Sequence, residues 1–292
     1  MPEEGPSAWV DPPSTRVRPT SPEHPPLPSD PDACPSLDAS YATSLEHALA
    51  TAGLVLDPAA RAGIDAHARL LMAWNAAINL SGIRVPAAVA VEHVADSLSA
   101  LPLLRAAGTP GRPSLLDLGS GGGYPGLPLG LALPAGRLAL VESVAKKARF
   151  LAIAGRAAAA AMRAAGSEPP AVEALAARAE SLAADRSHRG HWDVVTARAV
   201  AALVELVELA LPLVSVGGLL VAWKRDAGDG ALDAEITAAG PVLAAVGGRL
   251  ESVEPVGVPG LEDHRLVAVR AVAPAPVRFP RPPAERRRGL RG

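Results

Sequence analysis

The chain of 292 residues contains very little cysteine and few aromatic residues. Its single cysteine, Cys34, excludes an internal disulfide framework and a Cys-x-x-Cys metal site. We therefore expect no bound metal and a reducing, cytoplasmic setting. Because aromatic residues make up only 3% of a chain that is 49% hydrophobic, alanine, leucine and valine must form most of the core.

The sequence also lacks a long uninterrupted apolar run. Its longest apolar stretch, Leu203–Trp223, is broken by Glu205, Glu208 and the pair Gly217-Gly218. A helix followed by a strand explains this stretch better than a membrane span does. The N-terminus is acidic and rich in proline, which argues against a signal peptide. We therefore expect no membrane association.

Neither sign of charge is in large excess, since the net charge is −2. The charges are unevenly distributed, however. Residues 1–40 contain seven acidic and two basic side chains, a balance of −5, which leaves +3 for the rest of the chain. The final stretch, VRFPRPPAERRRGLRG, carries six arginines and one glutamate. A tail of this kind either contacts phosphates or is a solvated end.

Four regions of the chain differ in composition. Residues 1–40 are rich in proline and poor in large apolar side chains, which predicts a disordered leader. Residues 41–105 have the apolar periodicity of helices, and residues 106–272 alternate between strand-like and helix-like segments. Residues 273–292 form the basic tail.

The alternation in residues 106–272 predicts an α/β fold with helices on both faces of a sheet. Seven strands are expected, at Ser114–Leu118, Arg137–Glu142, Ala171–Leu175, Trp192–Thr196, Leu219–Trp223, Leu250–Val256 and Arg265–Val272. Helices are expected in this region at 126–133, 144–165, 200–213 and 229–246. Three further helices are expected before it: the first ends near Gly53, the second begins at Asp57-Pro58, and the third covers Ala87–Leu104. Because no helix separates the last two strands, we expect a mostly parallel sheet with an antiparallel hairpin at its edge.

A glycine-rich loop follows the first predicted strand, in the stretch SLLDLGSGGGYPGLPLGLAL. Its segment GGGYPG has the G-x-G-x-x-G spacing of a dinucleotide site, and a plain turn without a ligand is a second alternative. Asp117, two residues before Gly119, favours a third ligand, because a carboxylate there repels a pyrophosphate and attracts an ammonium group. The loop therefore resembles the D-x-G-x-G-x-G loop of S-adenosylmethionine (SAM) methyltransferases, where glycines let the backbone approach the amino-acid end of SAM.

Glu142 closes the second predicted strand, about 20 residues after the glycine loop. An acid at this position can accept hydrogen bonds from both hydroxyls of a ribose. Dinucleotide sites use the same device, so Glu142 indicates a nucleoside without distinguishing the two cofactors. The alternative is an unpaired surface glutamate.

Different base methylations require different residues. Methylation at a pyrimidine carbon requires a thiolate, but Cys34 lies in the predicted leader. Methylation of an exocyclic amine commonly uses an Asn/Asp-Pro-Pro-aromatic turn after the fourth strand, where this chain has TARAVA instead. Guanine N7 has a free lone pair, so its methylation needs alignment rather than a general base. We assign no catalytic residue, and Arg198 is a candidate for positioning.

Eight motifs occur in one order between about Tyr41 and the C-terminus: WNAAINLSGIR, VEHVADSL, LLDLGSGGGYPGLPL, LVESVAKKARFL, AARAESL, DVVTARAVA, GGLLVAWK and VRFPRPPAERRRGL. Together they resemble the bacterial 16S ribosomal RNA guanine-N7 methyltransferases, also called the glucose-inhibited division protein B family. The segments GYPGLP and TARAVA are the most specific of them. The resemblance implies a Rossmann-like SAM-dependent methyltransferase fold and transfer of a methyl group to N7 of a guanine in 16S ribosomal RNA.

The resemblance also implies SAM contacts, which add to those expected from the loop itself. The expected cofactor-binding residues are Asp117, Gly119, Gly121, Gly123, Tyr124, Glu142, Ala179, Glu180 and Arg198. Glu180 would meet the adenine amino edge, with a solvated acid as the alternative. Arg198 would bind the SAM carboxylate or an RNA phosphate, with a structural ion pair as the alternative.

Several cations are expected to contact RNA, with a solvated surface as the alternative. These are Lys146, Lys147, Arg149, Lys224, Arg286, Arg287 and Arg288. The first three open a predicted helix, where cations oppose the helix dipole, so a phosphate partner is attractive there. Tyr124 and Trp223 are candidates by position for stacking on the target base, which must leave its own stack.

The chain departs from the family pattern at several positions. Glu92 stands where arginine commonly precedes the histidine, Ile78 replaces a frequent tyrosine, and Tyr124 replaces a frequent leucine. His93 and Asp96, three residues apart on one predicted helix face, either bond each other or contact substrate. Near the C-terminus, EDHRL reverses the usual order of arginine and histidine.

The sequence leaves two rival functions open. One is a SAM-dependent methyltransferase of a small molecule or protein, and the other is a ribosome assembly factor without turnover. The reading we favour is a cytoplasmic, monomeric enzyme whose partners are SAM and 16S ribosomal RNA or the small ribosomal subunit.

Overall fold

A computed structural model describes residues 27–133 and 135–289, except for the side chains of 287–289. Residues 1–26 of the predicted leader therefore lie outside the described residues, and so do the side chains of Arg287 and Arg288.

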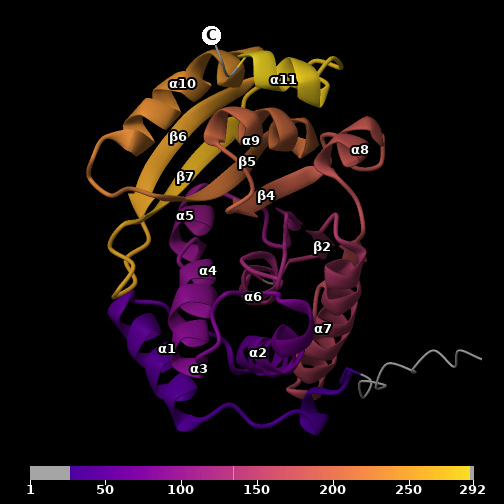
Figure 1. Ribbon diagram of the computed structural model, residues 1–292, viewed down its shortest axis with the longest axis vertical. Helices are drawn as coiled ribbons and strands as arrows, with labels where there is room; N and C mark the ends of the chain where they lie inside the picture. Colours follow the sequence, from indigo (N-terminus) through magenta and orange to yellow (C-terminus); the bar gives the residue numbers. More distant parts are fainter. Residues whose placement is uncertain (1–26, 134, 290–292) are drawn as a thin grey trace, which may run out of the picture.

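A seven-stranded sheet with the order β3-β2-β1-β4-β5-β7-β6 forms the centre of the protein (Figure 1). The strands are β1 Ser114–Leu118, β2 Arg137–Val141, β3 Ala171–Leu175, β4 Trp192–Arg198, β5 Val214–Arg225, β6 Gly248–Pro255 and β7 His264–Ala271. The pairs from β3 to β5 are parallel, and β7 pairs antiparallel with both β5 and β6. This arrangement confirms the expected α/β fold with an antiparallel hairpin at the sheet edge.

Helices cover both faces of the sheet (Figure 1). One layer contains α1 Ala39–Thr51, α2 Pro58–Ile78, α3 Pro86–Ala88, α4 Asp96–Leu98, α5 Leu101–Ala106, α6 Gly126–Ala132 and α7 Ala145–Ala164. The other contains α8 Ala179–Ala184, α9 Leu203–Ala210 and α10 Ala231–Ala245, and the short α11 Pro283–Gly289 follows near the C-terminus. The Asp57-Pro58 cap predicted for α2 is confirmed, because the Asp57 carboxylate accepts hydrogen bonds from the first free amides of the helix.

The alternation of side chains along β1 divides the core into two layers. Leu115 packs into the cluster formed with the N-terminal helices, and Leu116 packs into the cluster formed with α8 to α10. Both are fully buried, as the two-residue period of a strand covered on both faces requires. The N-terminal helices therefore complete one face of the sheet and share its core.

Residues 27–40 are ordered in the structure, contrary to the predicted disorder of the whole leader. The indole Nε1 of Trp74 donates to the Pro28 carbonyl at 2.7 Å. Arg69 on α2 donates to the Cys34 carbonyl at 3.0 Å and to the Asp32 carboxylate at 2.8 Å. These contacts hold the segment against α2, a tertiary interaction that the proline-rich composition does not indicate.

The predicted single helix over Ala87–Leu104 is divided in the structure. A π-helical segment, Val89–Ala95, lies between α3 and α4, and α5 begins after a turn at Ser99-Ala100. Within the described residues, the stretch Pro86–Ala106 is long and apolar enough to span a membrane, but 61% of its most apolar window is buried inside the protein. Its apolar character is thus explained by the core it fills.

Other boundaries differ where loops reach the site. β4 continues through Arg198, two residues beyond the prediction, because the parallel pairing with β5 extends that far. The helix expected from residue 200 begins only at Leu203, which leaves residues 199–202 as a loop above the sheet. α8 and α11 were not predicted from the sequence.

Candidate functional site

The glycine loop after β1 has a backbone shape that requires glycine. Gly119, Gly121 and Gly123 have φ values of 69°, 53° and 93°, in the region that glycine tolerates best. A Cβ on Gly119 would lie 2.8 Å from the side chain of Val200, and one on Gly123 would lie 2.8 Å from Nε2 of His67. The loop is therefore packed closely against two neighbouring segments, and its backbone forms the floor of a cavity.

Asp117 lies behind this loop and not at its mouth. Its side chain is fully buried, and its Oδ1 accepts a hydrogen bond from Thr196 Oγ1 at 2.7 Å. Gly126 packs so closely that a Cβ there would overlap the Asp117 carboxyl. Burial is the main influence on its pKa, which is raised to about 6. The expected direct contact with an ammonium group is thus wrong in this geometry. The Asp117 side chain instead bonds Thr196 and packs against Gly126 at the end of the loop.

Glu142 follows β2 and faces the same loop. Its Oε2 accepts from the Gly121 amide at 3.2 Å, and its Oε1 accepts from the Val144 amide at 2.9 Å. These bonds fix the carboxylate at the carboxyl edge of the sheet. Oε1 also accepts a long bond from Ser143 Oγ at 3.5 Å, whereas Oε2 keeps a free lone pair. Glu142 can therefore accept a ribose hydroxyl at Oε2, and a second hydroxyl at Oε1 if it replaces Ser143.

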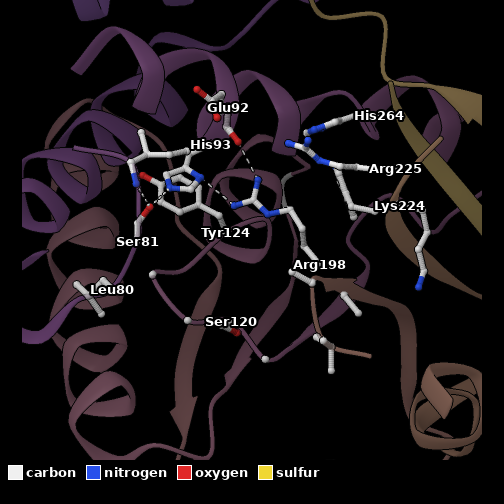
Figure 2. Close-up of a pocket in the computed structure, with 18 of the residues that line it drawn as sticks. Leu80, Ser81, Glu92, His93, Ser120, Tyr124, Arg198, Lys224, Arg225 and His264 are labelled. Atoms are coloured by element: carbon white, nitrogen blue, oxygen red, sulfur yellow. Dashed lines mark hydrogen bonds between the residues drawn. The ribbon is translucent and has the colours of Figure 1, made fainter. Parts of the chain in front are cut away.

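Two cavities open at this edge, as expected for a parallel α/β sheet. The larger has a volume of about 530 Å³ and lies between the glycine loop, the π-helical segment and the ends of β4, β5 and β7 (Figure 2). The smaller, about 250 Å³, lies beside Glu142 and α8. Gly119, Val200 and Ala201 line both, so the cavities adjoin across the loop that follows β4.

The smaller cavity contains the residues expected to meet the nucleoside of SAM. Glu142, Ala179 and Glu180 line it. Arg286 and Glu205 line it as well. Arg286 donates to the Glu180 carboxylate at 2.6 Å and is only 5% exposed. This burial contradicts the prediction that Arg286 grips RNA.

Arg198 is the centre of a polar network in the larger cavity (Figure 2). Its Nη1 donates to Asp96 Oδ2 at 2.7 Å and to the Glu92 carbonyl at 2.9 Å, and its Nη2 donates to His93 Nδ1 at 3.0 Å. Three of its five N–H groups are thus used within the chain, and two remain for a ligand. One alternative predicted a hydrogen bond between His93 and Asp96, and the structure does not contain it. They are linked through this guanidinium.

His93 is held as a neutral imidazole. Because its Nδ1 accepts from Arg198, the ring proton must lie on Nε2, which donates to Ser81 Oγ at 2.6 Å. Burial, with added repulsion from Arg198, lowers the pKa of His93 to about 3. His93 therefore links Ser81 to Arg198 through two hydrogen bonds and carries no charge at neutral pH.

The ring of Tyr124 is sandwiched between two histidines. Its centroid lies 4.5 Å from the centroids of both His67 and His93, with stacked geometries. Both faces are therefore occupied, and the expectation that Tyr124 stacks on a target base is wrong. Trp223 lines the larger cavity, and its Nε1 donates to the Asp96 carbonyl at 3.0 Å. Of the two aromatic candidates, Trp223 remains.

The predicted RNA-contacting cations occupy different environments. Lys146 and Arg149 are exposed and Lys147 is half-buried, all at the start of α7 beside Glu142. Lys224 does not project outward, because its Nζ donates to the Ala201 carbonyl at 3.0 Å and to Glu235 at 2.7 Å. The structure therefore leaves only the α7 group as an exposed basic rim among the predicted cations whose side chains are described.

Several residues of the larger cavity were not assigned a role from the sequence, although EDHRL contains His264 and TARAVA contains Ala199. His264 Nδ1 donates to the second oxygen of Asp96 at 3.0 Å, and Arg225, whose side chain is 72% exposed, lies at the rim. Ala199 has a φ of 56°, an unusual conformation for alanine, directly after Arg198. The signal for Ala199 was the TARAVA motif. No local pattern indicates that His264 faces Asp96.

The residues present fit SAM. The glycine backbone lets the amino-acid end of SAM approach closely, and Arg198 in the same cavity has two N–H groups left for its carboxylate. Glu142 offers the acceptor that a ribose needs. The summed volume is within the range of pockets that enclose ligands of this size. Gly119, Gly121, Glu142, Ala179 and Glu180 would hold it.

Comparison with known proteins supports this assignment. The family model described as rRNA small subunit methyltransferase G matches residues 61–239. Ribosomal RNA small subunit methyltransferase G of Roseiflexus castenholzii is 42% identical over 211 residues, which cover 72% of this chain and 83% of that protein. The proteins of the same name from Dehalococcoides mccartyi and Deinococcus radiodurans are 36% and 39% identical, over 81% and 73% of this chain and 94% and 78% of theirs. The resemblance drawn from the motifs is confirmed, and the chain belongs to the rRNA small subunit methyltransferase G family of SAM-dependent methyltransferases.

Proposed function

We propose that this protein transfers a methyl group from SAM to N7 of a guanine in 16S ribosomal RNA, acting as a cytoplasmic monomer on the RNA or the small subunit. The observation that carries the proposal is the pair of adjoining cavities at Gly119. One is lined by Glu142 and Glu180, the acids expected to meet the nucleoside, and the other is large enough for a base beside the amino-acid end of SAM.

The chemistry of N7 agrees with the polar groups in the larger cavity. When bound, SAM would supply an electrophilic methyl group, and guanine N7 has a free lone pair, so no proton would have to be removed first. His93 has both ring nitrogens in hydrogen bonds, whereas His264 donates from Nδ1 to Asp96 and its buried Nε2 has no partner within the described residues. N7 methylation requires neither imidazole to accept a proton. A site of this kind works by alignment and by excluding water.

Each element has a separate task in this mechanism. The glycine loop and Glu142 would hold SAM, and Arg198 would offer its two remaining N–H groups to a carboxylate or phosphate. Trp223 provides an apolar wall for the extruded base. The exposed cations at the start of α7 attract the RNA backbone, so binding should weaken as salt is added.

Transfer of radiolabelled methyl from SAM tests the proposal. Unmodified 16S RNA and assembled 30S particles are incubated with the protein, and the RNA is then cleaved chemically at N7-methylguanine. We expect label at one cleavable guanine, and none with Glu142→Ala. The comparison of substrates tells whether free RNA or the subunit is modified.

Two other results would count against the proposal. Label at a site resistant to cleavage would move the reaction away from N7. Measurable SAM binding without label in either RNA substrate would favour methylation of a small molecule or protein, or an assembly factor without turnover.

A further inference from the structure

The C-terminal segment packs against the α8 to α10 side of the sheet. Arg189 donates to the carbonyls of Ala275, Pro276 and Phe279 at 2.9 Å each. The Phe279 ring is buried in the core. The segment 273–286, here called the C-terminal strap, is therefore a part of the fold, although its composition predicted a basic tail.

The strap then crosses α9 toward the smaller cavity. Arg281 donates through Nη2 to the buried carboxylate of Glu208 at 2.7 Å. Arg286 Nη1 donates back to the Arg281 carbonyl at 2.7 Å, which fixes one end of its guanidinium. The strap thus places Arg286, which is nearly fully buried, in the lining of the smaller cavity.

Arg286 holds two carboxylates at that cavity. Its Nη2 donates to Glu180 Oε1 at 2.6 Å, and its Nε donates to Glu205 Oε1 at 3.3 Å. The two acids are about one-third exposed, whereas Arg286 is 5% exposed. The guanidinium of Arg286 is thus engaged in these contacts, whereas the exposed parts of the Glu180 and Glu205 carboxylates remain accessible to a ligand.

The charge state of Glu180 depends on this arrangement. Partial burial favours the neutral acid, but the bond and charge of Arg286 prevail, and the pKa of Glu180 lies below its usual range. Without the guanidinium, Glu180 and Glu205 would repel each other across the space that it fills. Glu180 would then turn outward into water.

We propose that Arg286 is a positioning residue for SAM, which holds Glu180 as an ionised acceptor for the amino group of the adenine. The inference rests on the proposed use of SAM and adds to it a task for the C-terminal strap. A lysine could not replace this arginine fully, because a single ammonium cannot reproduce the fork that reaches both acids and the Arg281 carbonyl.

Isothermal titration of SAM into the purified full-length protein tests the inference without turnover. We expect Arg286→Gln to weaken SAM binding about tenfold, the range of one hydrogen bond to a charged group. Arg286→Lys should show a smaller loss. Arg278→Gln, an exposed arginine of the same strap, should bind SAM like the wild type.

A double-mutant cycle distinguishes positioning from general loosening of the strap. If Arg286 acts through Glu180, then Glu180→Gln combined with Arg286→Gln should bind SAM no more weakly than Glu180→Gln alone. Additive losses would overturn the inference. So would unchanged SAM affinity in Arg286→Gln together with weakened RNA binding, which would restore a phosphate-contacting role.

The cycle also separates this inference from the proposed function. SAM binding by the wild type with no effect of any Arg286 variant would reject the positioning role and leave the proposed function intact. Absence of SAM binding by the wild type would reject both. Urea unfolding of each variant identifies those that fail to fold, and Arg286→Lys then carries the comparison.

Discussion

The guanidinium of Arg198 donates to the carboxylate of Asp96 at 2.7 Å across 102 residues of sequence. Arg198 ends β4, and Asp96 begins α4 after the π-helical segment. Asp96 is fully buried and also binds His264 on β7. This pair joins the N-terminal helices to the sheet at the edge where the larger cavity opens.

Breaking this pair should destabilise the protein strongly. Asp96→Asn leaves the Arg198 charge without its buried partner, which costs about 3 kcal/mol of unfolding free energy. Urea unfolding monitored by tryptophan fluorescence measures the loss. Asp263→Asn is the control, because its ion pair with Arg225 is exposed and is worth less than about 1 kcal/mol. Equal losses in the two variants would contradict the assigned importance of the buried pair.

Stability should fall as the pH falls from 6.5 to 5. Burial lowers the pKa values of His67 to about 4 and His93 to about 3, so the unfolded chain binds more protons below pH 6.5 than the folded one. Each histidine then removes about 1.5 kcal/mol over this interval. Asp117, whose raised pKa is about 6, acts in the opposite direction between pH 6 and 3.8 and offsets part of the loss.

The pH effect is measured by urea unfolding at pH 6.5 and pH 5. His67→Gln should have a smaller difference between the two pH values than the wild type, whatever its absolute stability. A difference as large as that of the wild type would show that His67 is not the titrating group.

A methyl group added to the glycine loop should abolish much of the SAM affinity. Gly119→Ala combines an unfavourable φ of 69° with a Cβ 2.8 Å from Val200, so the loop must shift at the junction of the two cavities. We expect SAM binding to weaken at least tenfold, with a loss of stability of about 1 kcal/mol from the backbone. Gly260→Ala, which has a φ of 84° but open space around it, should lose stability only.

Removal of the cations at the start of α7 should weaken RNA binding in a salt-dependent manner. The triple variant Lys146→Gln, Lys147→Gln, Arg149→Gln should lower the slope of log affinity against log salt by about 2, if each side chain neutralises one phosphate of unpaired RNA. Filter binding at several salt concentrations measures the slope. Arg156→Gln with Arg163→Gln, exposed positions further along α7, should leave it unchanged.

Tyr124 should tolerate loss of its hydroxyl but not of its ring. The hydroxyl is buried and has no hydrogen-bond partner within the described residues, so Tyr124→Phe should be neutral or slightly stabilising. Tyr124→Leu removes the stack with His67 and His93, and we expect a loss of about 2 kcal/mol. Thermal unfolding of the two variants checks both expectations.

The alternation of strands and helices, the glycine loop and the acid that follows β2 could be predicted from the sequence. These features are local, because strand period, φ preference and helix capping depend on neighbouring residues. Glu142 and the glycines therefore lie where the patterns predicted. The eight motifs also identified the family, because their occurrence together in one order is far more specific than any single motif.

Which side chains are free to contact a ligand depends on tertiary packing and could not be predicted from the sequence. Asp117 and Arg286 have the residue types expected of ligand contacts, but one is buried behind the loop and the other is bound to Glu180 and Glu205. The partners of Arg198 and His264 come from segments far apart in the chain. Burial and long-range pairing depend on how complete helices and strands pack, and no local pattern of residues specifies them.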